Sequence, residues 1–434
     1  MDAFQQSLYN QPVLQYERGK QLPCIRRIPM PALTLKECPK AYIRETHRSR
    51  TPDDTLRFIE TMKETIGMKD VGDVTDLDRL GIPVFTCHRI RPDDSRTDHT
   101  GKGLSKIQAQ VSLSMESAER FSSEFRPEYA GSLVLGSYSS LSARYSVLNP
   151  EELILPQFSR YDHDRKLYWT WGFDLANDVE ILVPACTVFH PFYLDDTPLI
   201  NTHTNGIAAG NTIEEAVSHA LAEVIERDAW SIAKFTEAAS DALGINDHPD
   251  NRFIIDIIER FNHAEIEVVA KDITTDIGVP VIAAFSNDLV YRKLMPIDGF
   301  GAHLDPKVAL VRALLEIATT RGLFIQKFGI DDWKLSYLDN TDGMNSEEDY
   351  RFCAYGQKNL HDLNADFSDD IFRDITTMMG KLNDRGFRKV IAVDLTRKKI
   401  GIPTARMIVP GMEVYCFDSS RRGDRLYDAL GKGG

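Results

Sequence analysis

Two segments of this 434-residue chain are predicted helices that carry glutamates along one face. They read SLSMESAERF at 112–121 and EEAVSHALAEVIERDA at 214–229, and both contain the pattern Glu-x-x-Glu-Arg. A helix turns by about 100° per residue, so Ser112, Glu116 and Glu119 of the first segment fall on one narrow stripe. A chain that folds with such a stripe must find a partner for the aligned carboxylates.

The second helix carries a longer stripe of the same kind. Glu215, His219, Glu223 and Glu226 lie within roughly 80° of one another, opposite an apolar face. Like charges at this spacing cost about 0.2–0.5 kcal/mol per pair when exposed and more when buried, so a cation is expected to offset them. Mg²⁺ suits carboxylate oxygens and is usually bound by a few of them together with substrate phosphates. If the two helices face one another, a magnesium site is predicted at Glu116, Glu119, Glu215, Glu223 and Glu226.

Other interpretations of the stripes are open at this point. Both stripes could simply face water. A di-iron carboxylate bundle would require Glu-x-x-His pairs, whereas this chain has Glu215-x-x-x-His219. The glycine-bearing segment TGKGLS before the first helix is neither Gly-x-x-x-x-Gly-Lys-Ser/Thr nor Gly-x-Gly-x-x-Gly. A nucleotide site in this chain must therefore be built without an ordinary phosphate loop.

Charge and cysteine usage exclude several classes of protein. The net charge of −14 argues against a protein that wraps nucleic acid or coats anionic membranes. No apolar run approaches the length of a membrane span of about 18 residues, and the first residues have no signal-peptide pattern. The six cysteines are scattered and include no Cys-x-x-Cys pair. We therefore expect a cytoplasmic protein with reduced, mostly buried thiols.

Residues 1–50 are rich in Pro, Gln and Arg with little periodicity, and are interpreted as an extension that lies over the body of the protein. Beyond them helical and strand patterns alternate, which predicts an α/β or α+β layered fold in one compact unit. Helices are expected at 51–67, from 105 onward, and at 212–238, 251–264, 306–326 and 370–387. Strands are expected at 82–90, 166–175, 179–189, 265–274, 279–287, 389–396 and 404–415. The polar segment 91–103 is expected to be a loop.

Seven segments of the chain resemble the YcaO-domain family and follow one another in that family's order. Two are the acidic helices with the glycine-bearing segments before them; the others are 40–56, 73–84, 299–321, 393–403 and 409–414. The resemblance implies a layered α/β (α+β) fold with ferredoxin-like units and an atypical ATP site between the acidic helices. It divides the chain into an N-terminal extension at 1–50, which contributes to the nucleotide site, and a YcaO domain at 51–434.

The resemblance also implies roles for individual residues in binding ATP and Mg²⁺. Its motifs assign catalytic roles to Glu119, Glu223 and Glu226. They assign cofactor binding to Ser112, Glu116, Asn211, Glu215 and Arg227, and to Lys40, Thr46 and Arg48 in the extension. Arg321 is similar to a phosphate-contacting arginine of the family, with Arg312 as the second choice.

Members of this family activate a backbone amide of a peptide. A nucleophile adds to the carbonyl carbon, ATP phosphorylates the resulting oxygen, and phosphate leaves. A Cys, Ser or Thr side chain as nucleophile gives an azoline ring, and sulfide gives a thioamide. Azoline-forming members usually end in Pro-x-Pro-x-Pro, whereas this chain ends in RRGDRLYDALGKGG. The resemblance therefore favours the thioamide branch.

The single-domain layout resembles the stand-alone archaeal members linked to thioamidation of a glycine in the α subunit of methyl-coenzyme M reductase. The expected partners are this protein, sulfide or a sulfur-donor protein, an accessory partner protein and a second copy of the chain. Nucleic acid and membranes are not expected. Two alternatives stay open: an azoline-forming cyclodehydratase and a non-catalytic ATP-binding scaffold.

Overall fold

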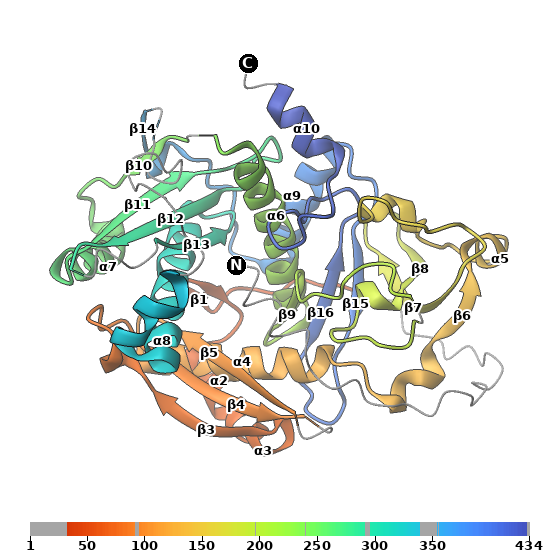
Figure 1. The fold of residues 1–434 in the computed structure, drawn as a ribbon, viewed down its shortest axis with the longest axis horizontal. Coiled ribbons are helices and arrows are strands. Elements are labelled where there is room, and N and C mark those ends of the chain that lie inside the picture. Colours follow the sequence, from red (N-terminus) through yellow and green to blue (C-terminus); the bar gives the residue numbers. More distant parts are fainter. Residues whose placement is uncertain are drawn as a thin grey trace.

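Three larger β-sheets and one two-stranded sheet, with the helices that pack on and between them, make up most of the described part of the chain (Figure 1). The computed structural model describes residues 33–91, 95–195, 197–238, 240–290, 296–338, 354 and 356–431. Helices and strands alternate along most of this length, so the predicted layered mixture of α and β is confirmed.

The smallest of the three larger sheets is antiparallel and consists of β3 (Met68–Asp73), β4 (Val84–Ile90) and β5 (Arg96–Lys102). Helix α4 (Lys106–Ser123) packs on it, and α2 (Pro52–Glu60) packs on α4. The short helix α3 (Lys63–Ile66) precedes β3.

The prediction of a loop at 91–103 is wrong, because β5 occupies most of this segment. Strand β5 lies at the sheet edge, and its outward positions are polar. Its buried positions are His99 and Gly101, so the strand lacks the apolar alternation by which strands are usually found.

Glycines let two helices lie directly on the strands that precede them. A Cβ atom at Gly101 in β5 would lie 2.1 Å from the backbone nitrogen of Leu113 in α4. The same holds at Gly301 in β13 (Ile297–Ala302), where a Cβ atom would lie 2.1 Å from the carbonyl oxygen of Ala309 in α8 (Pro306–Leu338). The glycine-bearing segments before these helices are thus needed for close packing of helix on strand.

The largest sheet is antiparallel, with strand order β6 (Val134–Ser137), β7 (Lys166–Asp174), β15 (Ile391–Asp394), β16 (Thr404–Ile408) and β9 (Ile207–Ala209). Strand β8 (Val179–Pro184) pairs with β7, and α5 (Tyr138–Ser142) follows β6. Helices α6 (Ile213–Thr236) and α9 (Ile371–Asp384) pack together over β9 and β16, and α10 (Asp424–Gly431) packs on α6. The strand predicted at 404–415 ends at Ile408, and the chain then turns through Gly411, which has a φ of +88°.

The third sheet has the order β13, β12 (Val281–Asp288), β11 (Ile266–Asp272), β10 (Ala242–Gly244) and β14 (Gln357–Asn359). Helices α7 (Arg252–His263) and α8 share an apolar core with it. On the α6 side, Trp230 of α6 stacks on Phe300 of β13 with 4.0 Å between ring centroids. Helix α6 therefore packs against the two largest sheets, near the centre of the molecule (Figure 1).

The described part of the N-terminal extension, residues 33–50, runs along this central region. Its two short strands, β1 (Tyr42–Ile43) and β2 (His47–Arg48), form a hairpin. Cys38 N donates to Asp370 Oδ2 at 2.7 Å, and Ser49 N donates to Glu215 Oε2 at 3.0 Å. The extension therefore connects α9 to the first turn of α6.

The expectations for cysteines and membrane segments can be examined for the described residues. Cys38, Cys87, Cys186 and Cys416 are buried free thiols, whereas Cys24 and Cys353 lie outside the described residues. Among the helices that the structure describes, none has the length and apolarity needed to cross a membrane.

Candidate functional site

The two glutamate stripes line one cavity of about 370 Å³. Ligand pockets typically have volumes of roughly 300–1,000 Å³, so this cavity is large enough for a nucleotide-sized ligand. Helix α4 contributes Ser112, Glu116, Glu119 and Arg120 to the lining, and α6 contributes Glu215, His219, Glu223, Glu226 and Arg227. The prediction that the two acidic helices face a common space is confirmed.

Each stripe is placed by a strand that leads directly into its helix. Helix α4 follows β5 and is capped by Ser105, whose hydroxyl accepts from Gln108 N in a capping box. Helix α6 follows β9 and is capped by Thr212, whose hydroxyl accepts from Glu215 N at 3.1 Å. Strand β9 packs against both helices and so brings the two stripes together.

Three of the cavity's glutamates are difficult to ionise while no cation is bound. Burial raises the pKa of Glu119 to about 8; Arg120 opposes the shift, and Glu223 and Glu116 add to it. Burial also raises the pKa of Glu226 to about 7 and shifts the pKa of Glu223 upward. The cavity therefore holds more carboxylates than it can keep charged by itself, which is the property expected of a cation site.

The other two glutamates of the predicted magnesium site, Glu116 and Glu215, already have hydrogen-bond partners within the protein. Burial opposes ionisation of Glu116, but a hydrogen bond to His99 and the charge of Arg120 hold its pKa below the ordinary value. Glu215 already accepts from Ser49 N at 3.0 Å, from Ser49 Oγ at 2.8 Å and from Asn211 Nδ2. Glu215 thus ties the extension to α6 at the cavity.

Cationic side chains lie among these carboxylates. The lining contains seven glutamates and six lysines and arginines, so it offers partners both to a metal ion and to phosphates. Arg120 lies 3.0 Å from Glu119, and Arg227 lies 3.8 Å from Glu223. Arg312 of α8 donates to the carbonyl oxygen of Ala302 at 2.8 Å and forms no ion pair with a described residue. A guanidinium with free donors suits a phosphate ligand.

The residues fit a magnesium nucleotide, although the carboxylates do not form a closed metal cage. Among the described residues, no three His, Cys, Asp or Glu side chains converge closely enough to hold a metal ion alone. This arrangement suits Mg²⁺, which is commonly bound through one or two carboxylates plus substrate phosphates. Thr46 Oγ1, in the cavity lining, is also buried with no hydrogen-bond partner in the described structure.

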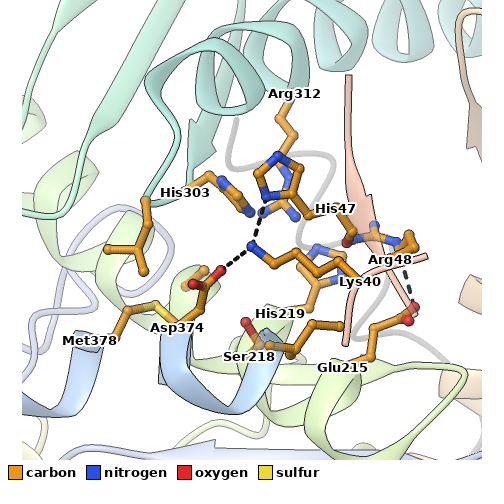
Figure 2. A pocket seen from close by; sticks show the side chains of 13 residues that line it. Lys40, His47, Arg48, Glu215, Ser218, His219, His303, Arg312, Asp374 and Met378 are labelled. Carbon is orange, nitrogen blue, oxygen red and sulfur yellow. Dashed lines mark hydrogen bonds and ion pairs between the residues drawn. The ribbon is translucent and has the colours of Figure 1, made fainter. Parts of the chain in front are cut away.

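Lys40, predicted to bind the cofactor, lines a separate cavity of about 20 Å³ (Figure 2). Its ammonium group donates to Asp374 at 2.5 Å and approaches His47 Nδ1 at 3.0 Å. Burial and the charge of Lys40 lower the pKa of His47 to about 3. The volume suits about one water molecule. Residues that line both this cavity and the acidic one are Arg48, Glu215, His219 and Arg312.

The two candidate arginines of α8 lie in different surroundings. Arg321, the first choice from sequence, does not line the acidic cavity; its Nε donates to Asp78 at 2.7 Å and its Nη2 donates to Asp288 at 3.1 Å. Its exposed fraction is 3%, so these ion pairs are buried. Arg312, the second choice, lines the cavity, and so does Glu316, which the sequence analysis missed.

A signal for Glu316 was present in the sequence. Arg312 and Glu316 are four positions apart on a helix that follows the glycine-bearing segment GFGAHLDP, as the two acidic helices follow theirs. Side chains at this spacing share a helix face. A third strand–glycine–helix unit could therefore have been predicted at the same cavity.

These features define a layered α/β protein with a nucleotide-sized cavity, lined by carboxylates and arginines from three helices. The chain belongs to the YcaO family, whose model, described as "YcaO cyclodehydratase, ATP-ad Mg2+-binding", matches residues 100–413. The family predicted from the sequence and its fold are thereby confirmed.

Similar proteins match the chain over most of its length. An uncharacterized protein of Methanothermobacter thermautotrophicus is 35% identical over 386 residues, which cover 87% of this chain and 98% of the relative. YcaO from Methanopyrus kandleri, solved bound with AMPPCP and Mg²⁺, is 28% identical with a TM-score of 0.71, covering 89% of this chain and 98% of that one. A heterocyclase in complex with substrate and cofactor shares the fold at 22% identity, with a TM-score of 0.80 over 93% of this chain and 57% of that one.

Proposed function

We propose that this protein uses ATP and Mg²⁺ to convert a backbone amide of a peptide into a thioamide, with sulfide as the nucleophile. The proposed substrate is a glycine in the α subunit of methyl-coenzyme M reductase. The observation that carries the proposal is the cavity of about 370 Å³ in which carboxylates of α4 and α6 meet arginines. A magnesium triphosphate needs both kinds of partner.

The share of each relative that this chain covers differs between the archaeal proteins and the heterocyclases. The match covers 98% of the Methanopyrus kandleri chain and 98% of the Methanothermobacter relative. It covers only 57% of the heterocyclase solved with substrate and cofactor, and 49% of the heterocyclase TruD. The chain thus matches nearly the whole length of the two archaeal proteins but only about half of the length of the two heterocyclases.

The residues of the cavity divide into three roles in this proposal. Glu119, Glu223 and Glu226 supply carboxylates to Mg²⁺, with Glu116 beside them. Arg312 and Arg227 neutralise phosphate charge. Glu215 orients Asn211, Ser49 and Arg48, since its oxygens already accept hydrogen bonds from the first two and lie 3.5 Å from the third. Thr46 and Ser112, which also line the cavity, complete the nucleotide site.

ATP and Mg²⁺, when bound, supply the phosphoryl group that turns the amide oxygen into a leaving group and the charge that neutralises the triphosphate. The chain's contribution is to hold the peptide amide, the nucleophile and the phosphates in one geometry away from water. Lys40 supports this geometry from outside the cavity, because its ion pair with Asp374 fixes the extension that carries Thr46 and Arg48.

The full-length protein should thioamidate a glycine-containing peptide of the reductase when ATP, Mg²⁺ and sulfide are present. Mass spectrometry should find a product heavier by the difference between a sulfur and an oxygen atom, with phosphate released in equal amount. Loss of one water from a Cys- or Ser-containing peptide would instead identify a cyclodehydratase. Nucleotide binding without turnover, unaffected by Glu223→Gln, would identify a scaffold protein.

Binding of the magnesium nucleotide should release protons. In the ligand-free protein the pKa of Glu119 is about 8, so this carboxyl is protonated at pH 7. Mg²⁺ requires the carboxylate, so binding should release at least about one proton at pH 7, because Glu226, whose pKa is about 7, adds to the release from Glu119. The affinity should rise with pH and level off above pH 8. Calorimetry of Mg-ATP binding in phosphate and in Tris, whose ionisation enthalpies differ, measures the number of protons. A binding enthalpy independent of the buffer would contradict the assignment of Glu119.

A further inference from the structure

A second, cationic cavity lies beside the acidic one. It has a volume of about 50 Å³. Its polar side chains include His203, Asn205, Arg406 and Arg421. Both cavities border helix α6 at the same point along its length. Glu223 lines the acidic cavity, and the next residue, Val224, lines the cationic one.

Both arginines of this cavity are buried without a carboxylate partner. Arg406 is 3% exposed and Arg421 is 4% exposed, and neither forms an ion pair with a residue that the structure describes. Backbone carbonyl oxygens hold them instead: Arg406 Nη1 donates to His203 O at 2.8 Å, and Arg421 Nη2 donates to Leu153 O at 2.7 Å. The carboxylates of Glu223 and Asp418 act on Arg406 and Arg421 only from beyond ion-pair distance. A buried charge without a contacting counter-charge is unfavourable, so an anion in this cavity would stabilise the fold.

The imidazole of His203 lies between the two guanidinium groups. Its Nδ1 is 3.3 Å from Arg406 Nη2, and its Nε2 is 3.5 Å from Arg421 Nη1. Burial and the charges of Arg406 and Arg421 lower the pKa of His203 well below its ordinary value, so the ring is neutral. A neutral imidazole accepts at one nitrogen and donates at the other, whereas arginine only donates. One of the two contacts therefore brings two donors together, and the cluster needs one more acceptor.

Two further polar atoms of the cavity lack a partner in the part of the chain that the structure describes, one a donor and the other an acceptor. Arg406 Nε and Asn205 Oδ1 are both buried and have no hydrogen-bond partner among the described residues. A ligand that satisfies both must accept from the arginine and donate to the amide oxygen. Hydrosulfide can do both, since it is a monovalent anion with lone pairs and one S–H group. A volume of about 50 Å³ admits a few water-sized groups and excludes a nucleotide.

We propose that the cavity between Arg406, His203 and Arg421 binds a small monovalent anion, and that during thioamidation it holds hydrosulfide beside the ATP cavity. The first statement stands on the geometry alone, and the second rests on the proposed function. The site would store the nucleophile of the reaction next to the place where the amide is activated.

The anion site is tested first without any reaction. Crystals of the full-length protein are soaked in sodium bromide, and anomalous diffraction is measured at the bromine edge. A bromide within hydrogen-bond distance of both arginines is expected. The isosteric variant Asn205→Asp, which supplies a tethered carboxylate, should lose this peak and melt at a higher temperature than the parent in halide-free buffer. Water in the cavity of the parent, or bromide only on the surface, would overturn the anion site.

The role in the reaction is tested with Arg421→Lys, which keeps the charge and removes the planar fork. The KM for sulfide should rise by about tenfold or more, with the KM for ATP unchanged. An equal change in both constants would indicate a merely structural role. If the parent forms no thioamide, the proposed function fails, and the bromide experiment still decides whether the anion site exists.

Discussion

Replacing Glu226 by glutamine should weaken the binding of Mg-ATP by at least about 100-fold, which corresponds to about 2.7 kcal/mol. The glutamine keeps the shape of the side chain and can still accept from Ala302 N, which donates to Glu226 Oε2 at 3.0 Å. What the variant loses is the negative charge that a hard cation requires. Isothermal calorimetry with Mg²⁺ and a non-hydrolysable ATP analogue measures the loss, and Glu119→Gln should behave in the same way.

The loss should come without damage to the fold. Because burial raises the pKa of Glu226 to about 7, keeping this side chain charged at pH 8 destabilises the ligand-free protein. Glutamine removes that cost, so the variant should melt at the same or a higher temperature than the parent at pH 8.

Glu413→Gln is the matched control. Glu413 is also buried, and burial raises its pKa to about 7, but it does not line the acidic cavity. This variant should bind Mg-ATP normally, and normal binding by Glu226→Gln as well would remove the assigned magnesium site.

The glutamate stripes could be predicted because helical periodicity is a local property of the sequence. Spacing alone put Glu116 and Glu119 on one face of α4 and Glu223 and Glu226 on one face of α6. Their convergence on one cavity depends on β9, which packs against both helices. No local pattern in the sequence specifies that packing. The magnesium site could therefore be predicted only on the assumption that the two helices face one another.

The same reasoning left Arg120 out of the site and ranked Arg312 behind Arg321, because it considered each helix separately. Within the stripes no lysine separates the glutamates, yet Arg120 folds back to within 3.0 Å of Glu119, and Arg312 reaches the cavity from a third helix. Strand β5 was missed for a related reason: contact with α4 requires Gly101 and removes apolar residues from the buried face. The position of the arginines and the formation of β5 both depend on tertiary contacts, which local composition does not reveal.

The arginines of α8 provide the second large expected effect. Arg321→Met should destabilise the protein by about 3–5 kcal/mol, because it leaves buried carboxylates without the guanidinium that pairs them. Asp78 loses two hydrogen bonds, and Asp288 loses one of the groups that neutralise it. Urea denaturation followed by circular dichroism measures this change. The folded fraction should still bind Mg-ATP with unchanged affinity, since Arg321 does not line the cavity.

Arg312→Met should show the reverse pattern and serves as the comparison. Burial and the charge of Arg48 lower the pKa of Arg312 to about 10, so the protein without nucleotide holds this cation at a cost that methionine removes. Stability should therefore be kept or raised, whereas Mg-ATP affinity should fall by about tenfold or more through loss of a phosphate partner. If instead Arg321→Met weakens nucleotide binding in a stable protein, the arginine chosen first from the sequence contacts the phosphates, and the cavity must extend to it when the ligand binds.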